Sequence, residues 1–165
     1  MLTTSSAESQ EIEQYRRDVR KDLYARMISE MDTFSRVCDE LSVSRGFVSM
    51  GSEVEREINP PADDRELLRR ADERVRSAER ALSESIASAE LLASRQVIEL
   101  SKRFQVQCLR SATQALSEMA RRLKNMSVGV ETPPVAPEVP YQGIELAELR
   151  RAFIKAAKAD LALDD

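Results

Sequence analysis

The residue types that perform most enzyme chemistry are scarce in this chain. Its 165 residues include no histidine and only two cysteines, Cys38 and Cys108. Histidine is the usual general base and the commonest metal ligand, and two isolated thiols cannot complete a structural zinc tetrad. The sequence therefore excludes histidine-based catalysis, and we expect neither a metal nor a cofactor.

The remaining polar groups form no catalytic pattern either. Gly46 and Gly51 are not followed by the Lys-Ser or Lys-Thr pair of a phosphate-binding loop. Neighbouring carboxylates such as Asp63 and Asp64 lie in charge-rich segments, where we expect them to be solvated or to cap a helix. We therefore predict that the protein is not an enzyme.

Both cysteines fall on apolar positions of predicted helices. A free cysteine at such a position usually behaves as a small buried hydrophobe. Reduced thiols in the core are therefore the main expectation. A disulfide that joins the first long helix to the second is the alternative.

One segment has the spacing of a helix-turn-helix. Within residues 34–50, Val37 and Cys38 would be buried in a first helix and Ser42 would form the turn. The second helix would present Arg45 as its only basic residue, although a recognition helix needs cations for phosphates. The net charge of −4 also disfavours nucleic acid as a partner.

A second segment, residues 100–126, is clearly basic, because Glu118 is its only acidic residue. Cations near the C-terminus of a helix interact favourably with its dipole, which is the main interpretation. An acidic partner, a membrane surface or nucleic acid is the alternative. This predicted basic patch consists of Lys102, Arg103, Arg110, Arg121, Arg122 and Lys124.

The elements that carry these residues are predicted to be helices. Charged residues make up 33% of the chain, with only 4 glycines and 6 prolines, a composition typical of coiled coils and long helices. Apolar residues recur every three or four positions over 9–41 and again over 63–126, where no proline or glycine occurs. The spacing drifts after Ala93, where a strict supercoil is expected to relax. We predict an all-α fold: an elongated coiled coil or helical hairpin of two long helices.

The second helix cannot bury its apolar stripe on itself, so the stripe needs another helix. The predicted partner-binding seam consists of Leu68, Val75, Leu82, Leu92, Leu100, Phe104, Leu116 and Leu123. Residues 9–126 would form this long-helix unit, after a disordered segment at 1–8.

A proline-rich linker is predicted at 127–143, followed by a short amphipathic helix in 144–165. We expect this C-terminal helix to be a separate docking element, because the prolines prevent the long helix from running into it. Its predicted partner-binding face consists of Leu146, Leu149, Phe153, Ala157 and Leu161.

These patterns favour a structural or scaffold subunit of a multi-protein assembly. Its partners would be other helical proteins, in a homo- or hetero-oligomer. The alternative is a DNA-binding oligomer that uses the segment 34–50. No transmembrane segment and no signal peptide are found in the sequence, so we expect a cytoplasmic or nuclear protein that is not secreted.

Overall fold

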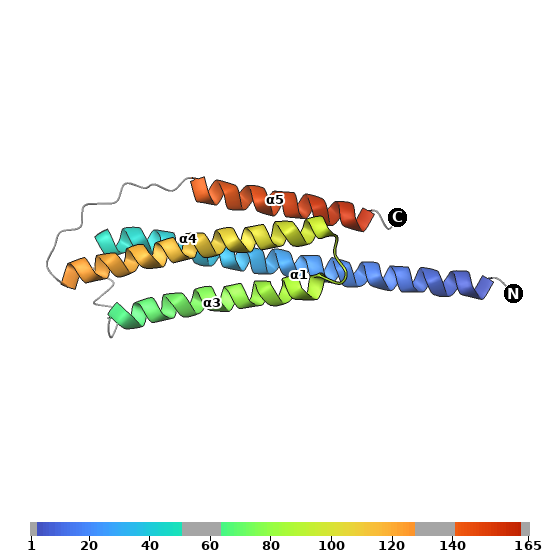
Figure 1. The fold of residues 1–165 in the computed structure, drawn as a ribbon, viewed down its shortest axis with the longest axis horizontal. Helices are drawn as coiled ribbons and strands as arrows, with labels where there is room; N and C mark the ends of the chain where they lie inside the picture. Colours follow the sequence, from blue (N-terminus) through green and yellow to red (C-terminus); the bar gives the residue numbers. More distant parts are fainter. Residues whose placement is uncertain (1–2, 51–63, 128–140, 163–165) are drawn as a thin grey trace.

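The computed structural model describes residues 3–50, 64–127 and 141–162. The prediction of an all-α protein is confirmed for these residues, which form four helices and no strand. The helices run alternately in opposite directions along an elongated bundle (Figure 1). They are α1 (Thr3–Met50), α3 (Asp64–Ala89), α4 (Arg95–Ser127) and α5 (Tyr141–Ala162).

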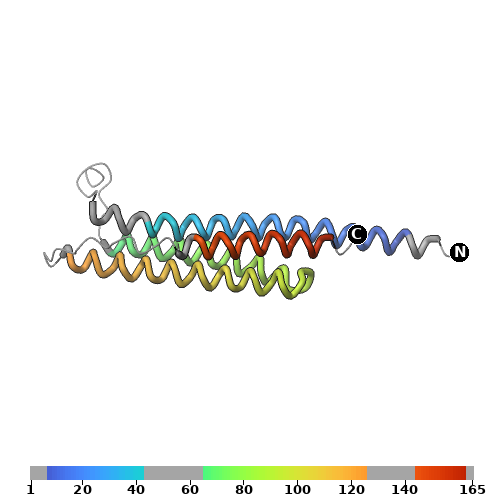
Figure 2. Tube along the Cα trace, turned by 90° about the horizontal axis from the view of Figure 1, so that it is seen from above, coloured from blue at the N-terminus to red at the C-terminus, as the bar shows by residue number. Residues whose placement is uncertain are grey.

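Two of the helices hold the bundle together. Both α1 and α4 pack against each of the other three helices, whereas α3 and α5 lie on opposite sides and do not contact each other. Figure 2 shows the same arrangement from above. The largest side chains of the core come from three helices: Phe34 from α1, Phe104 from α4 and Phe153 from α5, all at most 1% exposed.

The predicted continuous helix over 63–126 is wrong, because the chain reverses direction between α3 and α4. Backbone hydrogen bonds from Leu92 (3.0 Å) and Ala93 (2.8 Å) to the carbonyl of Ala89 close the end of α3. Ser94 then caps α4: its side-chain oxygen accepts the Val97 N–H at 3.5 Å. The capping serine ends the turn without a glycine or a proline.

Burial of apolar surface explains why the chain folds back at this point. A straight helix would leave its stripe in water, whereas the hairpin buries Leu82 and Phe104 in a common core. Each buried side chain of this size stabilises the folded state by about 1.5–3 kcal/mol. Interrupting the helix leaves Leu91 at the turn 93% exposed, which costs much less than an open stripe.

The helix α1 is longer at both ends than predicted. It begins at Thr3, so residues 3–8 are helical and the predicted disordered start at 1–8 is wrong for them. It also continues without a break through Met50, so the turn that a helix-turn-helix requires within 34–50 is absent. Most of the predicted linker, residues 128–140, lies outside the described part of the chain.

The C-terminal helix α5 is part of the bundle, so the prediction of a separate docking helix is wrong. It begins at Tyr141, slightly earlier than predicted, and packs on α1 and α4. Phe153 is fully buried and meets the ring of Tyr24 edge-on, with 6.3 Å between the ring centroids. Arg150 donates two hydrogen bonds to the carboxylate of Asp32 in α1, at 2.5 and 2.9 Å.

Replacing Phe153 with alanine should therefore destabilise the whole bundle. Removing a fully buried phenylalanine typically costs about 3–5 kcal/mol. We expect urea denaturation followed by circular dichroism to show this loss in the unfolding of the entire helical signal. Lys158→Ala, on the exposed side of the same helix, is the matched control and should change little. If Phe153→Ala left the unfolding of the other helices unchanged, α5 would be a separable element after all.

Candidate functional site

The N-terminal part of α1 runs past the end of the other helices (Figures 1 and 2). We call residues 7–23 the α1 extension. Every side chain from 7 to 16 is exposed, including two large apolar ones, Ile12 (54%) and Tyr15 (71%). Exposed apolar side chains on a helix that its own bundle does not cover make this segment the candidate interaction surface.

The exposed apolar residues of the extension continue the stripe by which α1 enters the core. This stripe consists of Ile12, Tyr15, Val19 and Leu23, separated by three, four and four residues. Such spacing places them on one face of a helix. Another step of four leads to Met27, which is fully buried in the bundle. Ile12 and Tyr15 therefore present to water the same face that binds other helices farther along α1, whereas Val19 and Leu23 are already half-buried.

Charged residues border this stripe with opposite signs on its two edges. At ~100° per residue, Glu11, Asp18 and Asp22 fall on one edge, Arg16 and Arg20 fall on the other together with Glu13, and Glu8 falls within the stripe. Charges that flank an apolar seam select the partner and its orientation in coiled coils. A helix packed on the extension would thus be favoured by basic residues over the first edge and acidic residues over the second.

A buried polar cluster lies where the extension meets the bundle. Asp160 of α5 accepts hydrogen bonds from the hydroxyl of Tyr24 in α1 and from the backbone N–H of Ser94 at 3.0 Å. The side chains of Asp160 and Tyr24 are buried, so these hydrogen bonds are shielded from water. One carboxylate thereby connects α1, α5 and the turn that precedes α4, and it anchors the base of the extension.

Most of the residues predicted to form a partner-binding seam lie in the core of their own bundle or pack against it. Val75, Leu82, Phe104 and Leu123 are buried, and the remaining seam residues, Leu68, Leu92, Leu100 and Leu116, are half-buried. Apart from Leu68 and Leu92, they belong to the core or pack against it, so most of the seam is a core and not an open contact surface. The same correction applies to the predicted docking face of α5, where Leu146, Phe153 and Ala157 are buried and Leu149 and Leu161 are half-buried.

The predicted basic patch is divided by the structure. Arg103, Arg110 and Arg121 share one exposed face of α4. Arg122 points inward, with a side chain only 6% exposed, and pairs with Glu118 at 3.2 Å. Arg121 pairs with the same carboxylate at 2.8 Å, and Lys102 pairs with Glu90 at 2.7 Å. Lys124 is also exposed. The pairing with carboxylates leaves a spaced row of cations instead of a dense patch.

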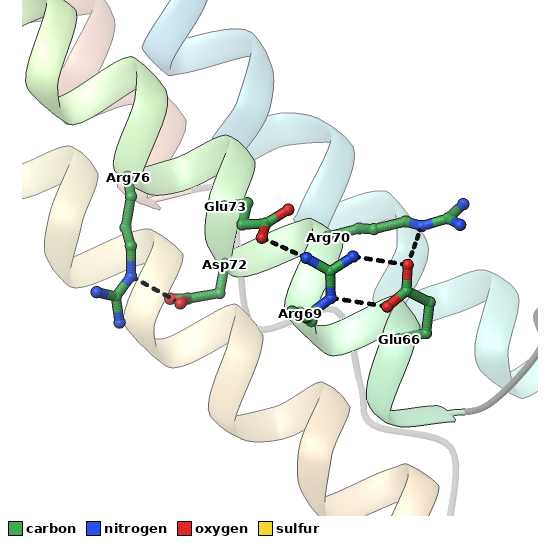
Figure 3. A network of polar contacts seen from close by, with 6 residues as sticks. All are labelled: Glu66, Arg69, Arg70, Asp72, Glu73 and Arg76. Atoms are coloured by element: carbon green, nitrogen blue, oxygen red, sulfur yellow. Dashed lines mark hydrogen bonds and ion pairs between the residues drawn. The ribbon is translucent and has the colours of Figure 1, made fainter.

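Arginines and carboxylates of α3 also pair with one another (Figure 3). The carboxylate of Glu66 accepts hydrogen bonds from Arg69 at 2.7 and 2.8 Å and from Arg70 at 2.7 Å. These two guanidinium groups lower the pKa of Glu66 to about 2. Arg69 also pairs with Glu73. The helix α3 contains six arginines and six carboxylates, so its formal charges cancel and it offers a partner no net charge.

Two further kinds of site were sought in the described residues: a metal-binding cluster and a membrane-spanning helix. Within 3–50, 64–127 and 141–162, no group of three His, Cys, Asp or Glu side chains is placed to hold a metal ion. Across the same ranges, no helix combines the length and the apolar character needed to cross a bilayer.

Two parts of the site could not be identified from the sequence: the exposure of the α1 extension and the polar cluster around Asp160. Ile12 and Tyr15 belong to the apolar periodicity over 9–41, but the sequence does not show that the other helices end before reaching them. Ser94 could have been found, because a serine three residues before the buried Val97 is a helix-capping pattern. Asp160 interrupts the apolar face of the last helix, and that interruption was its only signal in the sequence.

Comparisons with protein-family models, with curated proteins and with solved structures give no match to this chain.

Asp160 should contribute measurably to the closure of this end of the bundle. Its replacement by leucine removes the carboxylate that accepts hydrogen bonds from the Tyr24 hydroxyl and the Ser94 N–H, and losing the acceptor of a buried donor costs about 1–3 kcal/mol. We expect a lower free energy of unfolding and faster amide hydrogen exchange at residues 94–98.

Two related variants test the cause of that loss. Asp160→Asn keeps an oxygen acceptor and should lose less stability. In a Tyr24→Phe background, Asp160→Leu should cost less than in the native chain, because one of the two donors is already gone. Strict additivity of Tyr24→Phe and Asp160→Leu would contradict the shared hydrogen bond.

Proposed function

We propose that this protein is a non-catalytic helical scaffold that joins protein subunits, and that the α1 extension is its contact element. The partner is a helical protein that covers the apolar stripe of the extension. The observation that carries the proposal is the exposure of Ile12 and Tyr15 on a stripe that is otherwise buried along α1.

The energetics of an isolated helix support a bound partner. A single helical segment of this length is marginal in water, because tertiary packing supplies most helical stability in proteins. Burying Ile12, Tyr15 and Val19 under a partner helix would contribute about 1.5–3 kcal/mol for each side chain fully covered. Part of that gain offsets the entropy cost of association, so we expect a specific interaction of moderate strength.

The rigid base of the extension supports the same role. Asp160 ties α1 to α5 and to the turn before α4, so the extension leaves the bundle in a defined direction. A contact element on a rigid helix positions its partner more accurately than a flexible arm does. A scaffold function benefits from this property, because it sets the distance and the angle between the subunits it joins.

DNA binding through residues 34–50 is not proposed again, because α1 is one continuous helix across them. The absence of histidine from the sequence argues against most hydrolytic and metal-dependent activities. These two considerations leave protein binding as the function that the chain supports best.

Photo-cross-linking tests the proposal at single-residue resolution. With a photoreactive benzoylphenylalanine in place of Tyr15, irradiation in native extract should give a cross-linked product with a helical segment of another polypeptide chain. The same probe at Gln10, which lies on the opposite face of the extension, is the matched control and should give little product. Equal cross-linking from both positions, or none from position 15, would refute the proposed contact surface.

Two double variants distinguish the loss of apolar contact from the effect of added negative charge. Ile12→Asp combined with Tyr15→Asp should abolish the cross-linked partner's retention on the purified protein. Gln10→Asp combined with Gln14→Asp adds the same charge on the opposite face and should leave retention intact. Both double variants should keep the thermal unfolding midpoint of the bundle, because these residues lie outside the core.

A further inference from the structure

The only two cysteines of the chain lie next to each other in the core. They are 70 residues apart in the sequence, Cys38 in α1 and Cys108 in α4. The sulfur of Cys38 lies 3.4 Å from the backbone carbonyl oxygen of Cys108, to which it donates a hydrogen bond. Both side chains are buried, with exposed fractions of 3% and 0%.

A pair of thiols brought together by two different helices is more than a requirement of packing. Alanine fills comparable core positions of α4, for example Ala112 one turn farther on. Disulfides need their two cysteines on backbones that approach within about 7 Å between Cα atoms. The short distance from the Cys38 sulfur to the Cys108 backbone places the two cysteines side by side on neighbouring helices.

We propose that Cys38 and Cys108 form a redox-active pair, oxidised by a small hydroperoxide to an intrachain disulfide that ties α1 to α4. The Cys38 thiolate attacks the peroxide oxygen, the O–O bond breaks, and hydroxide or alkoxide leaves to give a sulfenic acid. The Cys108 sulfur then attacks the Cys38 sulfur, the S–O bond breaks, and water leaves. Two electrons pass from the two thiols to the peroxide, and the two thiol protons end in the alcohol or water released.

The surroundings of the pair assign these two roles. The neighbouring Cys108 lowers the pKa of Cys38, although burial and the nearby Asp39 carboxylate oppose this effect. The same interaction and burial raise the pKa of Cys108. Because the thiolate is the nucleophile, we assign the first reaction with the peroxide to Cys38, the less deeply buried of the two thiols (3% against 0% exposed), and the resolution of the sulfenic acid to Cys108. Local opening of the bundle admits the oxidant to the buried thiols.

The disulfide would be a covalent cross-link between α1 and α4. The two helices are otherwise joined through packing, and a bond between them closes a long loop of the chain, which restricts the unfolded state. Oxidation would therefore stabilise the bundle at the level of Cys38, far along α1 from its extension. This inference does not depend on the proposed scaffold function.

The experiment uses the full chain with hydrogen peroxide as the probe. Denatured-state thiol titration should show that both thiols disappear together, and intact-mass measurement should show the loss of two hydrogen atoms. The product should remain a single chain on non-reducing denaturing electrophoresis, migrate faster than the reduced chain, and unfold at a higher temperature. Dithiothreitol should reverse all these changes. Disulfide-linked pairs of chains, independent over-oxidation of the two sulfurs, or no reaction would overturn the proposal.

Three variants test the contact and the order of reaction. Cys108→Ala should stop the reaction at a sulfenic acid on Cys38 that dimedone traps, whereas Cys38→Ala should leave Cys108 unlabelled. The matched control combines Cys108→Ala with Ala112→Cys, which keeps two buried thiols but moves one of them along α4 by one turn. It should lose the disulfide product. Equal disulfide formation in this control, or dimedone labelling of Cys108 in the Cys38→Ala variant, would contradict the assignment.

Discussion

The structure depends on one constraint: a long helix with a narrow apolar stripe cannot bury that stripe on itself. The helix α4 carries such a stripe, with Val97, Phe104 and Cys108 at most 1% exposed. It achieves this burial because it packs against α1, α3 and α5 at once. The reversal of the chain after Ala89 and the return of α5 both serve to cover it. The helix α1 carries a similar stripe, and its exposed residues Ile12 and Tyr15 lie in the extension, which the other helices do not reach.

Polar contacts fix the register of helices that apolar packing alone would allow to slide. Asp32 and Arg150 join α1 to α5, and the amide of Gln107 in α4 donates to Glu145 in α5 at 2.9 Å. The carboxylate of Asp32 raises the pKa of Arg150 through their hydrogen bond, which is consistent with a charged pair at a partly exposed helix junction. Asp160 adds a buried contact at the base of the extension. Together they set the level at which α5 stops and α1 continues.

The periodicity of apolar residues in the sequence predicted many of the side chains that face the core, but it did not distinguish them from Ile12 and Tyr15, which are exposed. Leu82, Phe104 and Phe153 were expected on apolar faces and are fully or almost fully buried. The reversal of the chain could not be predicted in this way. Ala89, Ala93 and Val97 are each four residues apart, so the helical spacing continues through the turn without a visible fault. An apolar face also does not identify the helix that covers it, which is why α5 was expected to dock on another protein and instead packs on its own bundle.

The closed core depends on the hairpin between α3 and α4. A continuous helix would open this core and change which surface remains for a partner. A pulsed electron paramagnetic resonance distance between spin labels at Ser77 and Thr113, both exposed, tests it most directly. In the hairpin these positions lie on neighbouring antiparallel helices, whose axes are about 8–10 Å apart. The distance between the labels should therefore be well under half of the distance in a straight helix. In a straight helix they would be about 54 Å apart, at ~1.5 Å per residue. A short distance is the result that the account predicts, and a distance near that of the straight helix would contradict it.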